Sequence, residues 1–228
     1  MVVFMEQAHH PPHALIIHGG WSGHQPAETA AFAAHLLREA GCTVTLADSL
    51  AAFGDADLLA RQRLLVPVWT MGDLPADSAK VVLAAVRAGL GVGGWHGGMC
   101  DAFRANVEWQ FLTGGNWVAH PGNLTDYTVD IVRQDHPITA GLSSFAMHSE
   151  QYYLHVDPAV EVLATTTFHP RHEDHAWIEG VVMPTVWTKG WGQGRVFYTA
   201  LGHQLADLQV PTSTTILDRG LRWAAGLL

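Results

Sequence analysis

Apolar runs and amphipathic segments alternate along the first half of the chain. Mostly apolar runs of strand length occupy residues 14–18, 42–47 and 63–69, and a glycine-rich run begins at Gly89. Segments with helical spacing follow these runs at residues 26–40, 73–87 and 98–112, and a short helix with its loop is predicted within residues 50–62. Four strand–helix units in succession predict a mainly parallel sheet that is covered by helices on both faces.

The pattern changes after about residue 113 to short β segments. These are predicted at residues 127–132, 145–155, 160–167, 181–189 and 194–200, before a closing helix at 212–225. We interpret them as an extension of the sheet and a β-rich flank within one domain, which spans residues 14–228. Residues 1–13, which contain three histidines and two prolines, are predicted to be a flexible lead-in.

The loops that follow the predicted strands carry the first candidate site residues. Ligands of such sheets bind outside the carboxyl ends of the strands, and the loops after the first, third and fourth strands contain His24, Trp69 and His96. Residues 94–98 read G-x-H-x-G, the outline of a nucleophile elbow with histidine in place of serine or cysteine. A tight strand-to-helix turn with a packed histidine is the structural alternative.

Further candidates lie in the second half of the chain, in one predicted strand and after another. His148, Glu150 and Tyr152 alternate along the predicted strand 145–155, so they are expected to share one face, where a histidine and a carboxylate could form an acid–base or ligand pair. Exposed strand polarity is the alternative. His203 follows the predicted strand 194–200 and is expected at the same edge as His24 and His96; a helix N-cap or loop histidine is the alternative.

Other histidines are predicted to be structural. His120 and His136 each precede a proline and are interpreted as turn residues. His169, His172 and His175 are spaced by three residues in a polar segment, and we interpret it as a solvated loop rather than as a metal site.

Composition and charge narrow the range of functions. The net charge of −9 comes without a Lys/Arg cluster, which argues against a nucleic-acid partner. No apolar run approaches the roughly 18–20 residues that cross a bilayer, and no secretory leader pattern precedes residue 14, so we expect no membrane association and a cytoplasmic location. Cys42 and Cys100 form no C-x-x-C motif and are expected to be reduced. The 15 histidines and 9 tryptophans suit proton transfer, metal ligation and stacking against sugar rings.

Four segments, taken in order, resemble the ThuA-like family, which is named for trehalose utilisation. They are residues 89–103, 135–142 (with His-Pro-Ile-Thr-x-Gly-Leu from His136), 150–152 and 183–203, and Pro184 to His203 is the most specific. The resemblance covers residues 14–226. It implies a flavodoxin-like three-layer α/β sandwich, similar to class I glutamine amidotransferases, with extra β segments in the C-terminal half.

The comparison with amidotransferases also identifies what this chain lacks. His96 stands where those enzymes have the cysteine nucleophile, and Leu205 stands where a glutamate would follow His203. Cys100 lies four residues beyond the elbow position, inside the predicted helix. Glutaminase chemistry is therefore not expected.

The family's setting implies carbohydrate catabolism, with a disaccharide or its keto derivative as the small-molecule ligand. His24, His96, Glu150 and His203 are the predicted catalytic residues, acting either by acid–base chemistry or as ligands of a divalent metal such as Zn²⁺; both readings stay open. A non-catalytic sugar-binding or regulatory module is the alternative function, and a homodimer is compatible with the acidic, Trp-rich chain. The residues expected to contact the sugar are Trp21, Trp69, Trp95, Gln151, Tyr152 and Trp191.

Overall fold

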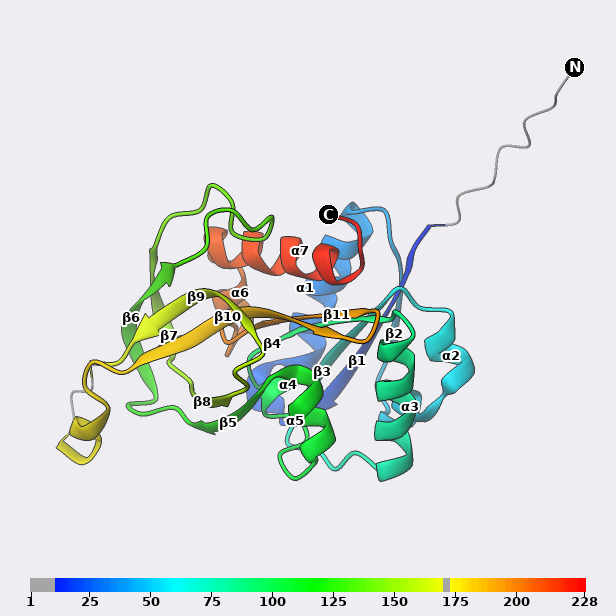
Figure 1. The fold of residues 1–228 in the computed structure, drawn as a ribbon, viewed down its shortest axis with the longest axis horizontal. Helices are drawn as coiled ribbons and strands as arrows, with labels where there is room; N and C mark the ends of the chain where they lie inside the picture. The colour runs from blue at the N-terminus through cyan, green and yellow to red at the C-terminus, as the bar shows by residue number, and fades with distance from the viewer. Residues whose placement is uncertain (1–10, 170–172) are drawn as a thin grey trace, which may run out of the picture.

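A nine-stranded mixed sheet runs through the protein, in the order β2-β1-β3-β4-β11-β10-β9-β6-β7 (Figure 1). The structure is a computed structural model that describes residues 11–169 and 173–228. The parallel part consists of β1 (His13–Gly20), β2 (Thr43–Ala47), β3 (Leu64–Thr70), β4 (Gly91–Trp95) and β11 (Gly194–Thr199). The antiparallel part adds β10 (Val182–Trp191), β9 (Glu161–Thr167), β6 (Leu124–Ile131) and β7 (Phe145–Glu150). Because β11 pairs with both β4 and β10, it joins the two halves of the chain in one sheet.

Helices cover both faces of the parallel part, as the alternating pattern predicts. Helices α1 (Pro26–Glu39) and α7 (Pro211–Ala224) lie on one face, and α2 (Ala56–Ala60), α3 (Ala76–Arg87) and α5 (Val107–Thr113) lie on the other (Figure 1). The alternation of β1 supplies both cores, since Ala14 and Ile16 face the first layer while Leu15 and Ile17 face the second. The result is the predicted three-layer α/β sandwich.

A glycine lets α7 lie close against the sheet. A Cβ atom at Gly220 would come within 2.1 Å of the Phe197 ring on β11. Close packing of this kind places the end of β11, and the loop that follows it, at a defined position beside β4.

Two predicted elements are divided in the structure. The segment 50–62 contains a short helix, as predicted, with a 3₁₀ turn (Leu50–Gly54) before α2, but the segment 98–112 forms two helices, α4 (His96–Cys100) and α5. Asn106 starts a separate helix because its side chain accepts a hydrogen bond from the Trp109 backbone N–H, which is a typical N-cap. The prediction of one helix over 98–112 was wrong in missing this cap.

The predicted strand 145–155 is also two strands. It contains β7 and β8 (Tyr153–Val156), and β8 pairs with β5 (Gly115–Ala119) in a separate two-stranded sheet. Gln151 lies between them and donates from its side-chain amide to the Thr166 hydroxyl and the Thr167 carbonyl of β9. The change of sheet depends on these long-range contacts, so the local pattern could not show it.

The ends of the chain complete the fold. Strand β1 already begins at His13, inside the segment predicted as the lead-in, whereas residues 1–10 lie outside the described residues. Helix α6 (Leu205–Leu208), which had not been predicted, follows β11. Within residues 11–169 and 173–228, no helix is long and apolar enough to cross a membrane.

Candidate functional site

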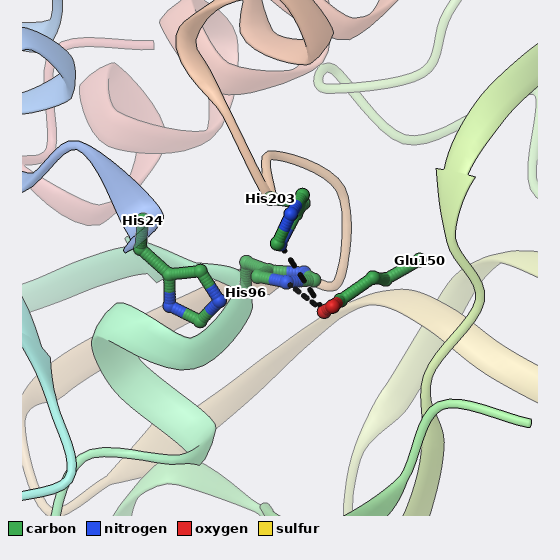
Figure 2. A group of neighbouring side chains, drawn as sticks. All are labelled: His24, His96, Glu150 and His203. Atoms are coloured by element: carbon green, nitrogen blue, oxygen red, sulfur yellow. Dashed lines mark hydrogen bonds and ion pairs between the residues drawn. The ribbon is translucent and has the colours of Figure 1, made fainter. Parts of the chain in front are cut away.

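Four buried side chains from distant parts of the sequence meet at the carboxyl edge of the parallel strands (Figure 2). They are His24 after β1, His96 at the start of α4, Glu150 at the end of β7 and His203 between β11 and α6. One ligand-type atom from each lies within 4.8 Å of the others. The structure therefore brings together the four residues that the sequence predicted to converge.

The elbow geometry explains the position of His96. Trp95 ends β4 in an extended conformation, and His96 then adopts φ +45°, a left-handed value that only a sharp turn requires of a residue with a side chain. The following Gly97 is necessary because a Cβ atom there would lie 2.5 Å from the His24 ring. The turn thus directs one imidazole into the site and leaves room for another.

The hydrogen bonds of His96 determine its tautomer. Its Nδ1 lies 2.8 Å from the carbonyl oxygen of Ala200, which can only accept, so Nδ1 carries the hydrogen. The ring also stacks on Tyr152, with centroids 3.8 Å apart. In the neutral ring, Nε2 therefore presents a lone pair.

That lone pair faces a carboxylate. His96 Nε2 lies 3.1 Å from Glu150 Oε2. Burial lowers the pKa of His96, which favours the neutral ring. Burial alone would raise the pKa of Glu150, but hydrogen bonds and positive charge from His203 and His96 lower it far below its ordinary value, so the carboxylate is favoured whenever these rings carry a proton on the facing nitrogen. Two acceptors at this distance need a shared proton or a cation between them.

The other two histidines, His24 and His203, each direct a ring nitrogen into the site. His24 Nδ1 lies 2.8 Å from the Thr70 hydroxyl, and burial, followed by the nearby His96 and His203, lowers the pKa of His24 to about 3. His203 Nδ1 lies 3.2 Å from Glu150 Oε2, yet it is buried and its orientation makes no hydrogen bond with any described residue. A buried nitrogen without a hydrogen bond requires another partner.

These features fit a metal centre. Three imidazoles and one carboxylate are a common ligand set for Zn²⁺, and backbone or hydroxyl contacts to the far nitrogens of His96 and His24 are typical of metal-binding histidines. Bonds of 2.0–2.1 Å in a tetrahedron put neighbouring ligand atoms about 3.3 Å apart. The contacts of 3.1 Å and 3.2 Å to Glu150 are close to this spacing.

Of the six residues predicted to contact the sugar, four lie at or near the site, and Trp21 is the one at its rim. Trp21 is 45% exposed, and its ring lies 4.7 Å from the His24 ring, so it stands at the rim of the site. Tyr152 covers His96, while the ring of Trp69 lies against Gly19 and Gly72 beside the Thr70 that holds His24. The Gln151 amide is bonded to β9.

The predictions that Trp95 and Trp191 contact the sugar are wrong. Trp95 is only 2% exposed and belongs to the core under α1 and α7, so a sugar cannot reach it. Trp191 packs against Phe111, with ring centroids 5.1 Å apart, and donates to the Leu83 carbonyl. Because β10 runs antiparallel to β11, its last residues lie at the edge where β11 begins, away from the site.

Two other predictions about histidines also change. His148 does not share a site with Glu150, because its exposed ring bonds to Asp126 at 2.7 Å while Glu150 turns inward at the end of β7. His120, predicted to be a turn residue, has Nε2 3.8 Å from Glu150 Oε1 and a side chain 32% exposed. A histidine before a proline is common in turns, so the sequence did not indicate that His120 lies beside Glu150.

The other described histidines that were predicted to be structural lie outside the site. His136 is a turn residue, as predicted, and its Nδ1 accepts from the Ile138 backbone N–H. His169 pairs with Glu179 at 2.8 Å, and His172 lies outside the described residues.

Fold and site together define an α/β sandwich protein with a buried histidine–glutamate centre at an elbow that carries no nucleophilic cysteine. The chain belongs to the family described as ThuA, trehalose utilisation, whose sequence profile matches residues 13–224. No curated protein matches the sequence.

Solved structures share the fold. A protein described as putative ThuA-like from Parabacteroides merdae is 19% identical with a TM-score of 0.77, and the match covers 95% of this chain and 90% of that one. Another, from Bacteroides uniformis, is 18% identical with a TM-score of 0.74 over 98% and 95% of the two chains. A protein from Salmonella typhimurium, described as cytoplasmic, is 13% identical with a TM-score of 0.62 over 94% and 98%.

Proposed function

We propose that this protein is an enzyme of carbohydrate catabolism that uses a divalent metal such as Zn²⁺ to act on a disaccharide or its keto derivative. The observation that carries the proposal is the contact between His96 Nε2 and Glu150 Oε2, two acceptors 3.1 Å apart in a buried site. The family's description as trehalose utilisation supports the substrate class.

His24, His96, Glu150 and His203 would hold the metal. When bound, it would polarise a carbonyl oxygen of the substrate or lower the pKa of a water molecule. The hydrogen bond from His96 Nδ1 to Ala200 and the contact of His24 with Thr70 keep two of the rings in position. These contacts thus hold the metal-binding nitrogen atoms in position before a metal binds.

The rim residues would receive the sugar. The exposed Trp21 ring offers a flat apolar surface next to His24, and such surfaces suit the C–H face of a sugar. His120 is more exposed than the four central side chains and lies next to Glu150 Oε1. A proton moved at a carbon beside a ketone needs a base within reach, and His120, which is not one of the four metal ligands, would be that base.

An amidotransferase or cysteine hydrolase function has no support in this site. Cys100 is fully buried in α4, and burial raises the pKa of its thiol far above the ordinary value. A thiol in this state is not a nucleophile. We place the enzyme in the cytoplasm, which agrees with the description of the Salmonella relative.

Metal analysis combined with activity tests the proposal. Untagged protein prepared with Zn²⁺ is expected to contain about one equivalent of metal and to turn over a keto-disaccharide. Glu150→Gln and His203→Ala should lose the metal and reduce turnover by about 100-fold or more. His148→Ala is the matched control, since this exposed histidine lies on the same strand as Glu150 but outside the site.

Two other outcomes would contradict the proposal. Full turnover by metal-free protein would reject the metal and leave histidine–glutamate acid–base chemistry. Saturable sugar binding without any product would reject catalysis in favour of a sugar-binding or regulatory module.

A further inference from the structure

A cavity of about 820 Å³ lies at the opposite edge of the sheet from the histidine–glutamate centre. Leu90, just before β4, and Arg195, at the start of β11, both line it, whereas the other ends of these parallel strands lead to His96 and Ala200. Pockets that bind small molecules have volumes of roughly 300–1,000 Å³. This cavity is therefore large enough for a ligand that is separate from the sugar.

The walls of the cavity combine small apolar side chains with the polar side chains of Gln62 and Gln193 and with three cations. Ala84, Ala85 and Ala88 line it from the last turn of α3 and its C-cap, and the buried Leu59 and Leu90 lie beneath. Alanines from α2 and the end of α7 complete the wall. Because methyl groups cannot fill the space between these three helices, a cavity remains with an apolar wall on this side.

The charges around the cavity are all of one sign. Arg63, Lys80 and Arg195 line it, and the described residues that line it include no Asp or Glu. Lys80 pairs with Asp77 nearby at 3.0 Å, but both side chains are well exposed, so this pair is weak. For a chain with a net charge of −9, three cations around one cavity form an unusual local environment.

The two arginines are oriented without being neutralised. Arg63 Nε donates to the Ala225 carbonyl at 2.9 Å, and Arg195 donates to the Trp223 carbonyl at 3.2 Å. Where the structure describes the chain, neither has a carboxylate partner, whereas Arg104 and Arg133 both do. Each guanidinium has five N–H donors, so most of them stay available to a ligand.

Capping of α7 accounts for only part of this arrangement. Cations commonly bind the last carbonyls of a helix, and that explains one donor from each arginine. It explains neither the space between the helices nor the fact that the charged residues lining this space are all cations. We propose that this cavity binds a small organic anion, a carboxylate or phosphate ester whose charged group contacts Arg63 and Arg195 and whose apolar body lies on Ala84 and Leu90.

Titration calorimetry with octanoate and octyl phosphate tests the proposal independently of any catalytic function. At least one probe should bind the wild-type protein with one-to-one saturation, and neutral 1-octanol should bind more weakly. The double variant Arg63→Gln/Arg195→Gln should weaken binding roughly tenfold or more, because charge-assisted hydrogen bonds are lost. Arg38→Gln, an exposed arginine on α1 outside the cavity, should leave binding unchanged.

A second variant covers the case in which the double arginine variant does not fold. Ala84 is exposed at the cavity, so Ala84→Phe can fill it without disturbing the core and should abolish binding. The proposal is overturned if neither probe saturates the wild-type protein or if Ala84→Phe binds as well as wild type. Equal affinity for 1-octanol would also overturn it, because the site would then not recognise an anion.

Discussion

At the scale of single residues, the protonation of a few atoms determines what this site can do. The Ala200 carbonyl places the hydrogen of His96 on Nδ1, and this leaves Nε2 to face Glu150. Residue type and position relative to the predicted strands identified His96, Glu150 and His203 as candidates, but no property of the sequence specifies a tautomer. The preference for a metal over proton transfer therefore rests on contacts that appear only in the folded chain.

The lowered pKa of His24 predicts how the stability of the metal-free protein depends on pH. Its folded pKa of about 3 lies below the unfolded value of 6.5, so the unfolded chain binds a proton in this range and the folded one does not. The free energy of unfolding should fall as the pH decreases from 6.5 towards 3, and His24→Gln should show a shallower dependence. Urea unfolding at pH 7, 6, 5 and 4 measures this, with the exposed His148→Gln as control. Parallel curves for wild type and His24→Gln would contradict the assignment.

At the scale of elements, α4 and the strand before it form the most constrained part of the site. The G-x-H-x-G spacing correctly predicted a sharp turn after a buried strand, because glycines allow the close contacts that such a turn creates. The predicted helix over 98–112 was too long, because α4 ends after five residues. Asn106, the cap of α5, was a local signal that could have shown this division.

Gly97→Ala tests the elbow. A Cβ atom would meet the His24 ring at 2.5 Å and the Tyr152 hydroxyl at 3.0 Å, so His24 must move from Thr70. We expect metal affinity to fall by about 10–100-fold, whereas the fold should persist because alanine favours helix. Metal titration and circular dichroism measure the two effects. Gly190→Ala, where a Cβ atom meets only open space, is the control, and equal affinity of both variants would reject the proposed crowding.

At the scale of the whole molecule, the four central residues connect segments from residue 24 to residue 203. They come from the parallel half of the sheet and from β7 at its far antiparallel edge. A metal bound by all four would cross-link both halves of the chain in the folded state only. Its binding energy would then appear as stability.

Thermal unfolding measures this link. At a free Zn²⁺ concentration of 100 times Kd, binding adds about 2.7 kcal/mol, which for a chain of this size raises Tm by roughly 5–10 °C. Removal of the metal with a chelator should reverse the shift, and His203→Ala should show little of it. The same shift in His203→Ala would indicate that Zn²⁺ binds elsewhere.

The three-layer sandwich and the carboxyl-edge position of three histidines could be predicted from the sequence, because strand and helix periods and the glycines of the elbow are local properties. That Glu150 turns towards these histidines while His148 does not is visible only in the folded chain, because it depends on where β7 ends and on the bonds of Gln151 to β9. The tertiary structure also placed His120 at the site and removed Trp191, because the direction of each strand in the sheet fixes which end reaches the site. Such directions are set by pairings between residues far apart in the chain, which a local pattern does not contain.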